Sequence, residues 1–351
     1  MAEYNINSLV KKLKGKYGTI RVAEEDDAVD KEYISTSIKA LDLALEGGIA
    51  WGYVTEVAGF SQSGKTTLLQ LLLAHAQKEF NAVGIWFDRE KAWFNKRAVD
   101  LGIDISKVIV ISPEDIPTVI EANALVDDIM SSIPDDQYKF ICIDSISAFA
   151  KTAKVDKSDM GKRALQIHDL FRMILKYTND KTSVNFANHR YYKPEVMFGD
   201  NTTSGGGEGP KYYTNYRIQM EDRKQIFNKK ENNAVMGNWI KATVNKTRNG
   251  PNYRHVVFPH YYEFGIPELG GYARLLVDRN YAAPASKAEF KSLKRGDFKV
   301  HGDDTVYDEF KLDELLEKHP ELNFSEYPKF NSVNGKVEED EDDDEFTIKG
   351  D

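Results

Sequence analysis

The segment Gly59–Thr67, GFSQSGKTT, constrains this chain most, because it fits the phosphate-loop pattern of Gly, four residues, Gly, Lys and Ser or Thr. Glycines let backbone N–H groups turn toward phosphate oxygens. Lys65 supplies a cation for the β- and γ-phosphates, and the Thr66 hydroxyl can bind Mg²⁺. An apolar strand precedes the loop and an apolar helix follows it, an order that a glycine-rich turn without a ligand would not need. The residues expected to contact a nucleotide are Gly59, Ser61, Gln62, Ser63, Gly64, Lys65, Thr66 and Thr67.

Short apolar strands alternate with helices after this loop. Strands are expected at 54–57, 83–87, 108–111, 140–145 and 184–189, and helices at 68–76, 118–130 and 164–177. The alternation predicts an α/β fold with a mostly parallel, doubly wound sheet and helices on both faces.

Acidic residues follow two of these strands. Carboxylates at the carboxyl ends of parallel strands lie beside the nucleotide in open α/β sheets, which draws attention to Asp88-Arg89-Glu90 and to Asp144. Asp144 fits the second nucleotide motif, an acid that holds Mg²⁺ through water. Apolar strands ending in Asp are common, so the motif depends on the phosphate loop that precedes it.

The remaining segments predict a core with additions at both ends. Strands are expected at 213–220 and 239–245 around a polar hairpin at 221–238, and at 256–258 and 261–264. Residues 1–33, with a helix at 5–17 and a strand at 19–22, form an N-terminal arm that packs on its own core or on a neighbouring subunit. The other expected parts are a core at 34–268, which opens with a helix at 38–45, a small C-terminal α/β region at 269–331 with a helix at 309–318, and a disordered acidic tail at 332–351.

Charge is concentrated at the C-terminus. The net charge is −9 and Glu338–Glu345 is a run of eight acidic residues, so the rest of the chain carries −9 + 8 = −1. A nearly neutral body can still gather Lys and Arg in a groove, so overall charge does not decide whether nucleic acid binds. The run serves solubility alone, or regulation and partner binding.

Apolar stretches are short and interrupted. No run is long enough to span a bilayer and the N-terminus lacks a signal-peptide layout, which predicts a cytoplasmic protein without a membrane partner. The single cysteine, Cys142, lies in an apolar run and is expected to be a buried, inert thiol.

Two basic, glycine-containing stretches stand out later in the chain. The first, 151–163, includes Lys162 and Arg163 and precedes a helix that carries Arg172; the second, 190–210, is long for a loop inside a domain. Basic groups bind phosphates, and aromatic or apolar side chains stack on or wedge between bases. DNA binding and a substrate lid both fit the second stretch, whose candidate contacts are Arg190, Lys193, Met197, Phe198, Gly205, Gly206 and Gly207.

Lys246 and Arg248 are two cations separated by one residue. On an extended segment both side chains would point the same way, toward one anionic target. A solvated strand end is the alternative.

From Ile34 to about Gly270 the chain resembles the RecA recombinase family, and its details are similar to the bacteriophage UvsX branch. The resemblance rests on the lead-in Ser37–Leu45 with the glycines that follow it, on Asn188-His189 and on Gly205–Pro210. UvsX-type proteins place His at the second position of that pair, where bacterial RecA has Gln.

The resemblance implies roles for single residues. Glu90 matches the catalytic glutamate that orients and activates water, and His189 matches the position that senses the γ-phosphate and signals to the DNA loop. Lys246 and Arg248 match paired cations that reach the neighbouring subunit's ATP. Arg97 falls where the family usually has a tyrosine that stacks on adenine, a place that a guanidinium can fill by stacking.

The function implied by the resemblance is that of a DNA-dependent ATPase with ATP and Mg²⁺. It would form helical filaments on single-stranded DNA and catalyse homologous pairing and strand exchange with duplex DNA in recombination, recombination-dependent replication and repair. A single-strand-binding protein and a recombination mediator are the implied partners. The alternatives are a ring-forming helicase of the same fold, an ATP-binding recombination accessory protein, and an interaction protein acting through its acidic tail.

Overall fold

The computed structural model describes residues 5–17, 31–114, 119–149, 160–192, 202–204, 209–228, 234–263, 265–284, 297–308, 312–329 and 331. The chain divides into two units, Met1–Tyr33 and Ile34–Asp351. In the first unit, helix α1 (Ile6–Tyr17) confirms the helix expected at 5–17, whereas the strand expected at 19–22 lies outside the described residues.

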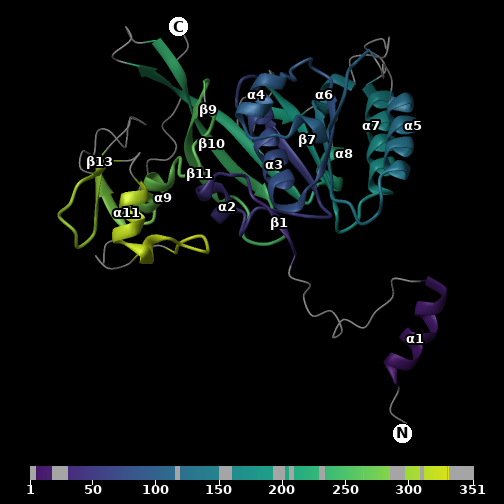
Figure 1. The fold of residues 1–351 in the computed structure, drawn as a ribbon, viewed down its shortest axis with the longest axis horizontal. Helices are drawn as coiled ribbons and strands as arrows, with labels where there is room; N and C mark the ends of the chain where they lie inside the picture. Colours follow the sequence, from purple (N-terminus) through teal and green to yellow (C-terminus); the bar gives the residue numbers. More distant parts are fainter. Residues whose placement is uncertain are drawn as a thin grey trace. The chain divides into compact units, whose positions relative to one another are not determined.

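A nine-stranded sheet forms the centre of the second unit (Figure 1). Its path runs β11-β10-β9-β3-β7-β6-β4-β5, and β8 pairs with β7 beside this path. The six strands from β9 to β5 are parallel to their neighbours, whereas β8, β10 and β11 pair antiparallel. The strands are β3 (Val54–Gly59), β4 (Val83–Asp88), β5 (Val108–Ile111), β6 (Lys139–Asp144), β7 (Thr182–Tyr192), β8 (Thr202–Ser204), β9 (Tyr216–Asn228), β10 (Ala234–Lys246) and β11 (His255–Tyr261). The predicted mostly parallel α/β sheet is confirmed.

Helices cover both faces of this sheet (Figure 1). Ile85 of β4 belongs to a core cluster with Val126 of α5 and Phe171 of α7. Its neighbour Gly84 faces α3 instead, because a Cβ there would lie 3.0 Å from Leu73 Cδ1. Successive strand residues point to opposite faces, so the sheet is doubly wound. The helices of the core are α2 (Lys39–Ala44), α3 (Lys65–Phe80), α4 (Asn95–Asp100), η2 (Ile105–Lys107), α5 (Val119–Ser132), α6 (Ile146–Phe149), α7 (Met160–Leu175) and α8 (Gly209–Tyr213).

The polar hairpin expected at 221–238 is confirmed, and most of it belongs to the longest strands of the sheet. β9 and β10 pair from Asn228 opposite Ala234 to Arg217 opposite Lys246, so most of 221–238 is strand. Backbone pairing extends both strands beyond the bounds expected from the sequence, because an apolar pattern indicates burial rather than pairing. The start of the strand expected at 213–220 is wrong, because Tyr213 closes α8.

Both ends of the stretch expected as a loop at 190–210 contain regular structure. β7 continues to Tyr192 and pairs with β8, with Arg190 opposite Ser204. An antiparallel ladder therefore stands where the sequence predicts an open loop. Similarly, α7 begins at Met160 rather than at Ala164, because the residues that precede Ala164 are mostly good helix formers. β11 contains the strand expected at 256–258 but only the first residue of the one expected at 261–264, because Tyr262 and Glu263 lie in a turn.

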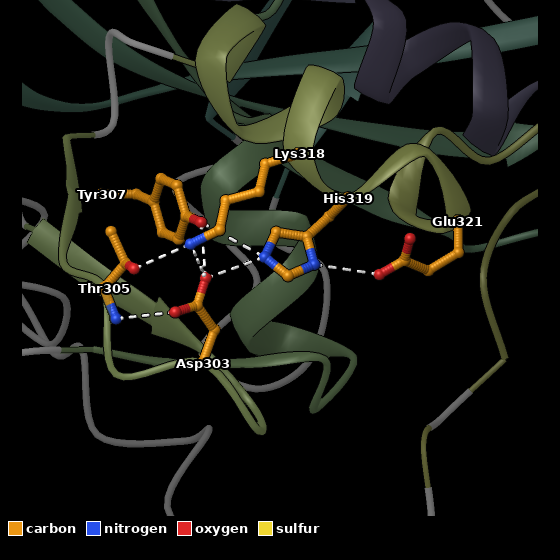
Figure 2. A network of polar contacts seen from close by, with 6 residues as sticks. All are labelled: Asp303, Thr305, Tyr307, Lys318, His319 and Glu321. Atoms are coloured by element: carbon orange, nitrogen blue, oxygen red, sulfur yellow. Dashed lines mark hydrogen bonds and ion pairs between the residues drawn. The ribbon is translucent and has the colours of Figure 1, made fainter.

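The described part of the C-terminal region contains a small sheet and short helices. Its elements are α9 (Tyr272–Asp278), β12 (Ala282–Pro284), β13 (Asp297–Val300), β14 (Tyr307–Asp308), α11 (Leu312–Lys318) and η4 (Pro320–Leu322), and a second small sheet pairs β1 (Tyr33–Ile34) with β2 (Ile49–Ala50). Asp303 connects the elements: its Oδ2 accepts from Lys318 Nζ at 2.7 Å and Tyr307 OH at 2.6 Å, and lies 2.9 Å from His319 Nε2 (Figure 2). In the described part of the chain, the helices are all too short or too polar to cross a membrane.

Candidate nucleotide site

The phosphate loop connects the end of β3 with the start of α3. Close packing requires Gly59, because a Cβ there would lie 2.4 Å from Ser63 Oγ and 2.5 Å from the Met220 carbonyl oxygen. Gly64 adopts φ 82°, a left-handed conformation that costs glycine little. Gly64 is also the N-cap of α3 and has no side chain, so the N–H groups of the first turn stay available to an anion. The helix dipole adds to that attraction.

Lys65 is held over the loop. Its Nζ donates to the Phe60 carbonyl at 2.7 Å, and Ser63 Oγ donates to the same oxygen at 2.9 Å. Burial lowers the pKa of Lys65, while the carboxylates of Asp144 and Glu90 act in the opposite direction. The ammonium group therefore lies between the loop and two carboxylates, where it can bind phosphate oxygens.

Thr66 and Asp144 form the predicted pair for a divalent cation. Thr66 Oγ1 donates to Asp144 Oδ2 at 2.6 Å, and burial raises the pKa of Asp144 to about 6. A hydroxyl and a carboxylate are oxygen ligands, which Mg²⁺ prefers. Among the described residues, His, Cys, Asp and Glu nowhere gather in groups of three or more that could hold a metal ion. The pair fits a cation that takes few protein ligands and binds phosphate oxygens as well.

The turn that carries Glu90 is fixed by Asp88. The Asp88 carboxylate accepts from the N–H of Ala92 at 2.8 Å and of Trp93 at 3.0 Å. The Arg89 N–H donates to the Asp144 carbonyl at 2.7 Å. Backbone and side chain together therefore attach this turn to the end of β6.

Glu90 has two side-chain partners. Its Oε1 lies 2.6 Å from His189 Nε2 and accepts from Ser145 Oγ. The hydrogen bond with His189, followed by that from Ser145, lowers the pKa of Glu90 to about 2. The carboxylate is therefore ionised at neutral pH, as a group that accepts a hydrogen bond from attacking water must be.

The order of the strands places His189 in the site. β7 lies between the phosphate-loop strand β3 and the Asp144 strand β6. In the parallel register Gly59 lies opposite His189 and Ala58 opposite Asn188. The Asn188-His189 pair therefore adjoins the start of the phosphate loop.

A buried carboxylate lies one step deeper in the sheet. Glu56 of β3 is fully buried and accepts from Arg217 Nε at 2.5 Å and Asn188 Nδ2 at 2.8 Å. Arg217 lies opposite Lys246 in the register of β9 and β10. Polar side chains thus connect β7, β3 and β9, and the backbone register places Lys246 beside the last of them.

Arg97 approaches the first turn of α3 from α4. Its Nη1 donates to the Tyr262 carbonyl at 3.0 Å and its Nη2 to Thr67 Oγ1 at 3.2 Å. The Arg97 guanidinium thus contacts Thr67, which the sequence predicts to be part of the nucleotide site. Stacking of Arg97 on a nucleotide base stays a prediction.

Lys246 is the last residue of β10, and Arg248 lies just beyond the end of this strand. β10 ends at Lys246, whose Nζ donates to the Lys211 carbonyl at 3.3 Å, and Arg248 is exposed. Burial lowers the pKa of Lys246, and the charges of Arg248 and Arg217 lower it further. The two cations are near each other, but Arg248 is not on the extended strand that the sequence predicts.

The candidate DNA contacts are described only in part. Arg172 is exposed on α7 and Arg190 lies on β7, while Lys162 and Arg163 belong to the first turns of α7. The other candidates, Lys193, Met197, Phe198, Gly205, Gly206 and Gly207, lie outside the described residues.

Several residues of the site were not predicted. Ser145 follows Asp144 directly, so its place in the sequence offered a signal. His260 of β11 lies 3.3 Å from Thr67 Oγ1, and Glu56 meets Arg217 across the sheet. A lone His and a lone Glu within strands carry no spacing that would identify such partners.

A loop that cradles phosphates, with a threonine hydroxyl bonded to a strand-end carboxylate, is the machinery of a phosphate-loop ATPase. Residues 3–267 match the RecA N-terminal domain family. Protein RecA from Francisella philomiragia subsp. philomiragia is 32% identical over 265 residues, or 74% of this chain and 71% of that protein. Protein RecA from Francisella tularensis subsp. novicida has the same identity and coverage. The chain belongs to the RecA family of recombinases, which are DNA-dependent ATPases.

Proposed function

We propose that this protein polymerises on single-stranded DNA with ATP and Mg²⁺, and pairs and exchanges that strand with homologous duplex DNA. The contact between Glu90 and His189 carries the proposal. It connects the acid expected to act in hydrolysis with the strand that leads into the candidate DNA segment. ATP hydrolysis and DNA affinity can therefore influence one another through one hydrogen bond.

The loop residues divide the chemistry among themselves. Lys65 and the N–H groups of α3 bind the phosphates, and Thr66 with Asp144 holds the cation. Bound Mg²⁺ would neutralise phosphate charge. Glu90 accepts a hydrogen bond from the attacking water and orients it. Lys246 and the exposed Arg248 reach a neighbouring subunit's ATP and stabilise charge that develops on the transferred phosphoryl group.

Self-assembly is supported by an apolar sheet edge. β5 ends the strand order, and its Ile109 and Val110 are 40% and 36% exposed. An edge strand with apolar side chains is a template for another chain. Within the arm, Ile6 and Leu9 of α1 are also exposed. We propose that the arm, residues 1–33, packs on the core (34–268) of a neighbouring subunit, and that the C-terminal region (269–331) and tail (332–351) are accessory to the filament.

DNA and partner binding belong to the same proposal. The stretch 190–210 would grip single-stranded DNA when His189 responds to the γ-phosphate, with the basic residues of α7 nearby in sequence. Homologous duplex DNA is the second substrate, and a single-strand-binding protein and a mediator are the proposed partners. The Asn188-His189 pair supports a place in the bacteriophage UvsX branch, and the proposed location is the cytoplasm, where the DNA is.

The test is ATP turnover with Mg²⁺, with and without single-stranded DNA, on samples that are also imaged by electron microscopy. DNA stimulation together with helical filaments is expected. Closed rings would favour a helicase, and turnover without a DNA response would favour an accessory protein.

A substitution in the edge strand β5 tests the role of this edge in filament formation. Ile109→Lys should still bind ATP, because β5 is separated from the phosphate-loop strand by three strands, but should not form filaments. Lys107→Gln, at the neighbouring surface, is the matched control and should assemble normally. Filaments of the Ile109→Lys variant with normal length would contradict the role of this edge.

A further inference from the structure

His260, on the edge strand β11, contacts the helix turn that follows the phosphate loop. It belongs to β11, which is three strands away from β3 in the sheet, yet its Nε2 lies 3.3 Å from Thr67 Oγ1 in the first turn of α3. The residue is 7% exposed. Burial, followed by the charge of Arg97, lowers its pKa to about 4, so the ring is neutral at physiological pH.

The surroundings of the other ring nitrogen assign the tautomer. His260 Nδ1 is buried and has no hydrogen-bond partner among the residues that the structure describes. It faces Gly64, because a Cβ built there would lie 3.4 Å from Nδ1 and 3.4 Å from the Met220 methyl carbon. A buried N–H without a partner is rarer in proteins than a buried acceptor without one. The ring proton is therefore assigned to Nε2, which donates to Thr67.

Thr67 then receives two hydrogen bonds. A hydroxyl has two lone pairs and one proton. Arg97 Nη2, which can only donate, reaches Thr67 Oγ1 at 3.2 Å, and His260 Nε2 occupies the second lone pair. Within the described part of the chain, these contacts leave the hydroxyl proton of Thr67 Oγ1 for a ligand, and the turn on which it lies is the one that receives phosphates.

We infer that His260 is a positioning residue of the nucleotide site, which together with Arg97 turns the Thr67 hydroxyl into a fixed donor for a nucleotide phosphate oxygen. The inference rests on the proposed function only in that the loop binds a nucleotide. Backbone N–H groups of a phosphate loop cradle the α/β-phosphates, and the inference assigns the Thr67 hydroxyl to these same phosphates. Phosphates on that side are common to ATP and ADP.

Binding to both nucleotides tests the inference. With the full chain and Mg²⁺, isothermal titration calorimetry of His260→Leu should show affinity lower by about tenfold for ATP and for ADP alike. His260→Gln, whose amide can still donate to Thr67, should stay within about threefold of the unmodified protein. In turnover assays with saturating DNA, His260→Leu should raise KM by a similar factor while kcat stays unchanged, because this contact is equal in the ground and transition states.

Two comparisons exclude a merely structural effect. Thr67→Val should lose about the same affinity as His260→Leu, and the double variant should lose no more than either single one. His189→Ala, by contrast, should change the ratio of ATP to ADP affinity, which the His260 variants should leave unchanged. Additive losses in the double variant would overturn the inference.

The tautomer gives a readout that is independent of nucleotide. The chain has seven histidines, so selective ¹⁵N labelling with a His260→Gln reference identifies the His260 ring signals. Shifts of the tautomer protonated at Nε2 are expected at neutral pH, and shifts of the Nδ1-protonated form would overturn the assignment. If the unmodified protein binds nucleotide without a DNA response, the proposed function fails while this test stands. If His260→Leu binds both nucleotides normally, only the inference fails.

Discussion

Glu90 Oε1 lies 2.6 Å from His189 Nε2, which joins the ends of two strands that are separated in the sheet by β6. Ser145, directly after β6, donates to the same oxygen. The three strand ends thus form one hydrogen-bonded unit around a single carboxylate. A change in the position of either side chain is transmitted directly to the other, which is the physical basis for coupling hydrolysis to the β7 strand end.

Replacing Glu90 by Gln should abolish most hydrolysis without removing nucleotide binding. The amide retains the size of the side chain and can still bond to Ser145, but it cannot accept a proton from water. Turnover should fall by about 10²-fold or more, the range for loss of a general base, while ATP affinity stays within about threefold. Glu114→Gln, which removes an exposed carboxylate paired with Lys91 near the same turn, is the control. Normal turnover in Glu90→Gln would exclude Glu90 as the base.

Replacing His189 by Ala should separate nucleotide binding from DNA affinity. The variant loses the hydrogen bond that connects Glu90 with β7, whereas the phosphate loop is untouched. Single-stranded DNA affinity, measured by fluorescence anisotropy with a slowly hydrolysed ATP analogue and with ADP, should then be the same in both states. His189→Gln can still donate to Glu90 and should restore much of the difference. Unchanged coupling in His189→Ala would rule out the proposed signal.

Local patterns in the sequence predict the elements that carry this site. The glycines and Lys65 predict the phosphate loop because backbone geometry and charge are local properties. The strands that end in Asp88 and Asp144 are predicted because they are continuously apolar and buried on both faces. The roles of Glu90 and His189 are predicted only by the resemblance to a family, because no spacing argument connects these residues.

Contacts between distant segments could not be predicted in the same way. Glu56 meets Arg217, and His260 meets Thr67, because the order of the strands brings them together. Which strands pair depends on the free energy of the whole sheet, so the sequence of one segment does not predict its partner strands. The full length of β9 and β10 was not predicted for the same reason, since hydrogen bonds to a partner strand compensate for the polar composition of the hairpin.

Replacing Asp144 by Asn should weaken the Mg²⁺ site. The carboxylate attracts the cation, but without a cation it repels phosphates from the same place. We therefore expect Asp144→Asn to need more Mg²⁺ for half-maximal turnover. In a chelator the variant should bind ATP as well as, or better than, the unmodified protein. Calorimetry with Mg²⁺ and with chelator measures both effects, and an unchanged Mg²⁺ requirement would remove Asp144 from the cation site.

Replacing Glu56 by Gln should destabilise the core. The change leaves Arg217 beside a neutral group within the sheet, and breaking a buried ion pair in this way costs about 3 kcal/mol. Urea unfolding should show the loss as a lower midpoint. Asp100→Asn, which breaks the exposed pair with Lys96, should cost less than about 0.5 kcal/mol.

Removing both partners of the buried pair separates the cost of an unpaired charge from the cost of lost packing. Glu56→Leu combined with Arg217→Met should recover most of the stability that Glu56→Gln loses, because no unpaired charge stays in the sheet. A double variant as unstable as the single one would show that the hydrogen bond of Glu56 with Asn188 is what matters.

The stability of the C-terminal region should fall as pH rises above neutrality. His319 is bonded to Asp303 and to Glu321, and the hydrogen bond with Asp303 is the main cause that raises its pKa above the ordinary value (Figure 2). Because the folded-state pKa is the higher one, the stabilisation is complete below about pH 6.5 and is lost as pH rises through the folded pKa. Urea unfolding followed by signals from this region should show the loss, and NMR titration should give a His319 pKa above 6.5. His319→Asn cannot titrate and should lack this part of the pH dependence; an equal dependence in both proteins would assign it to another group.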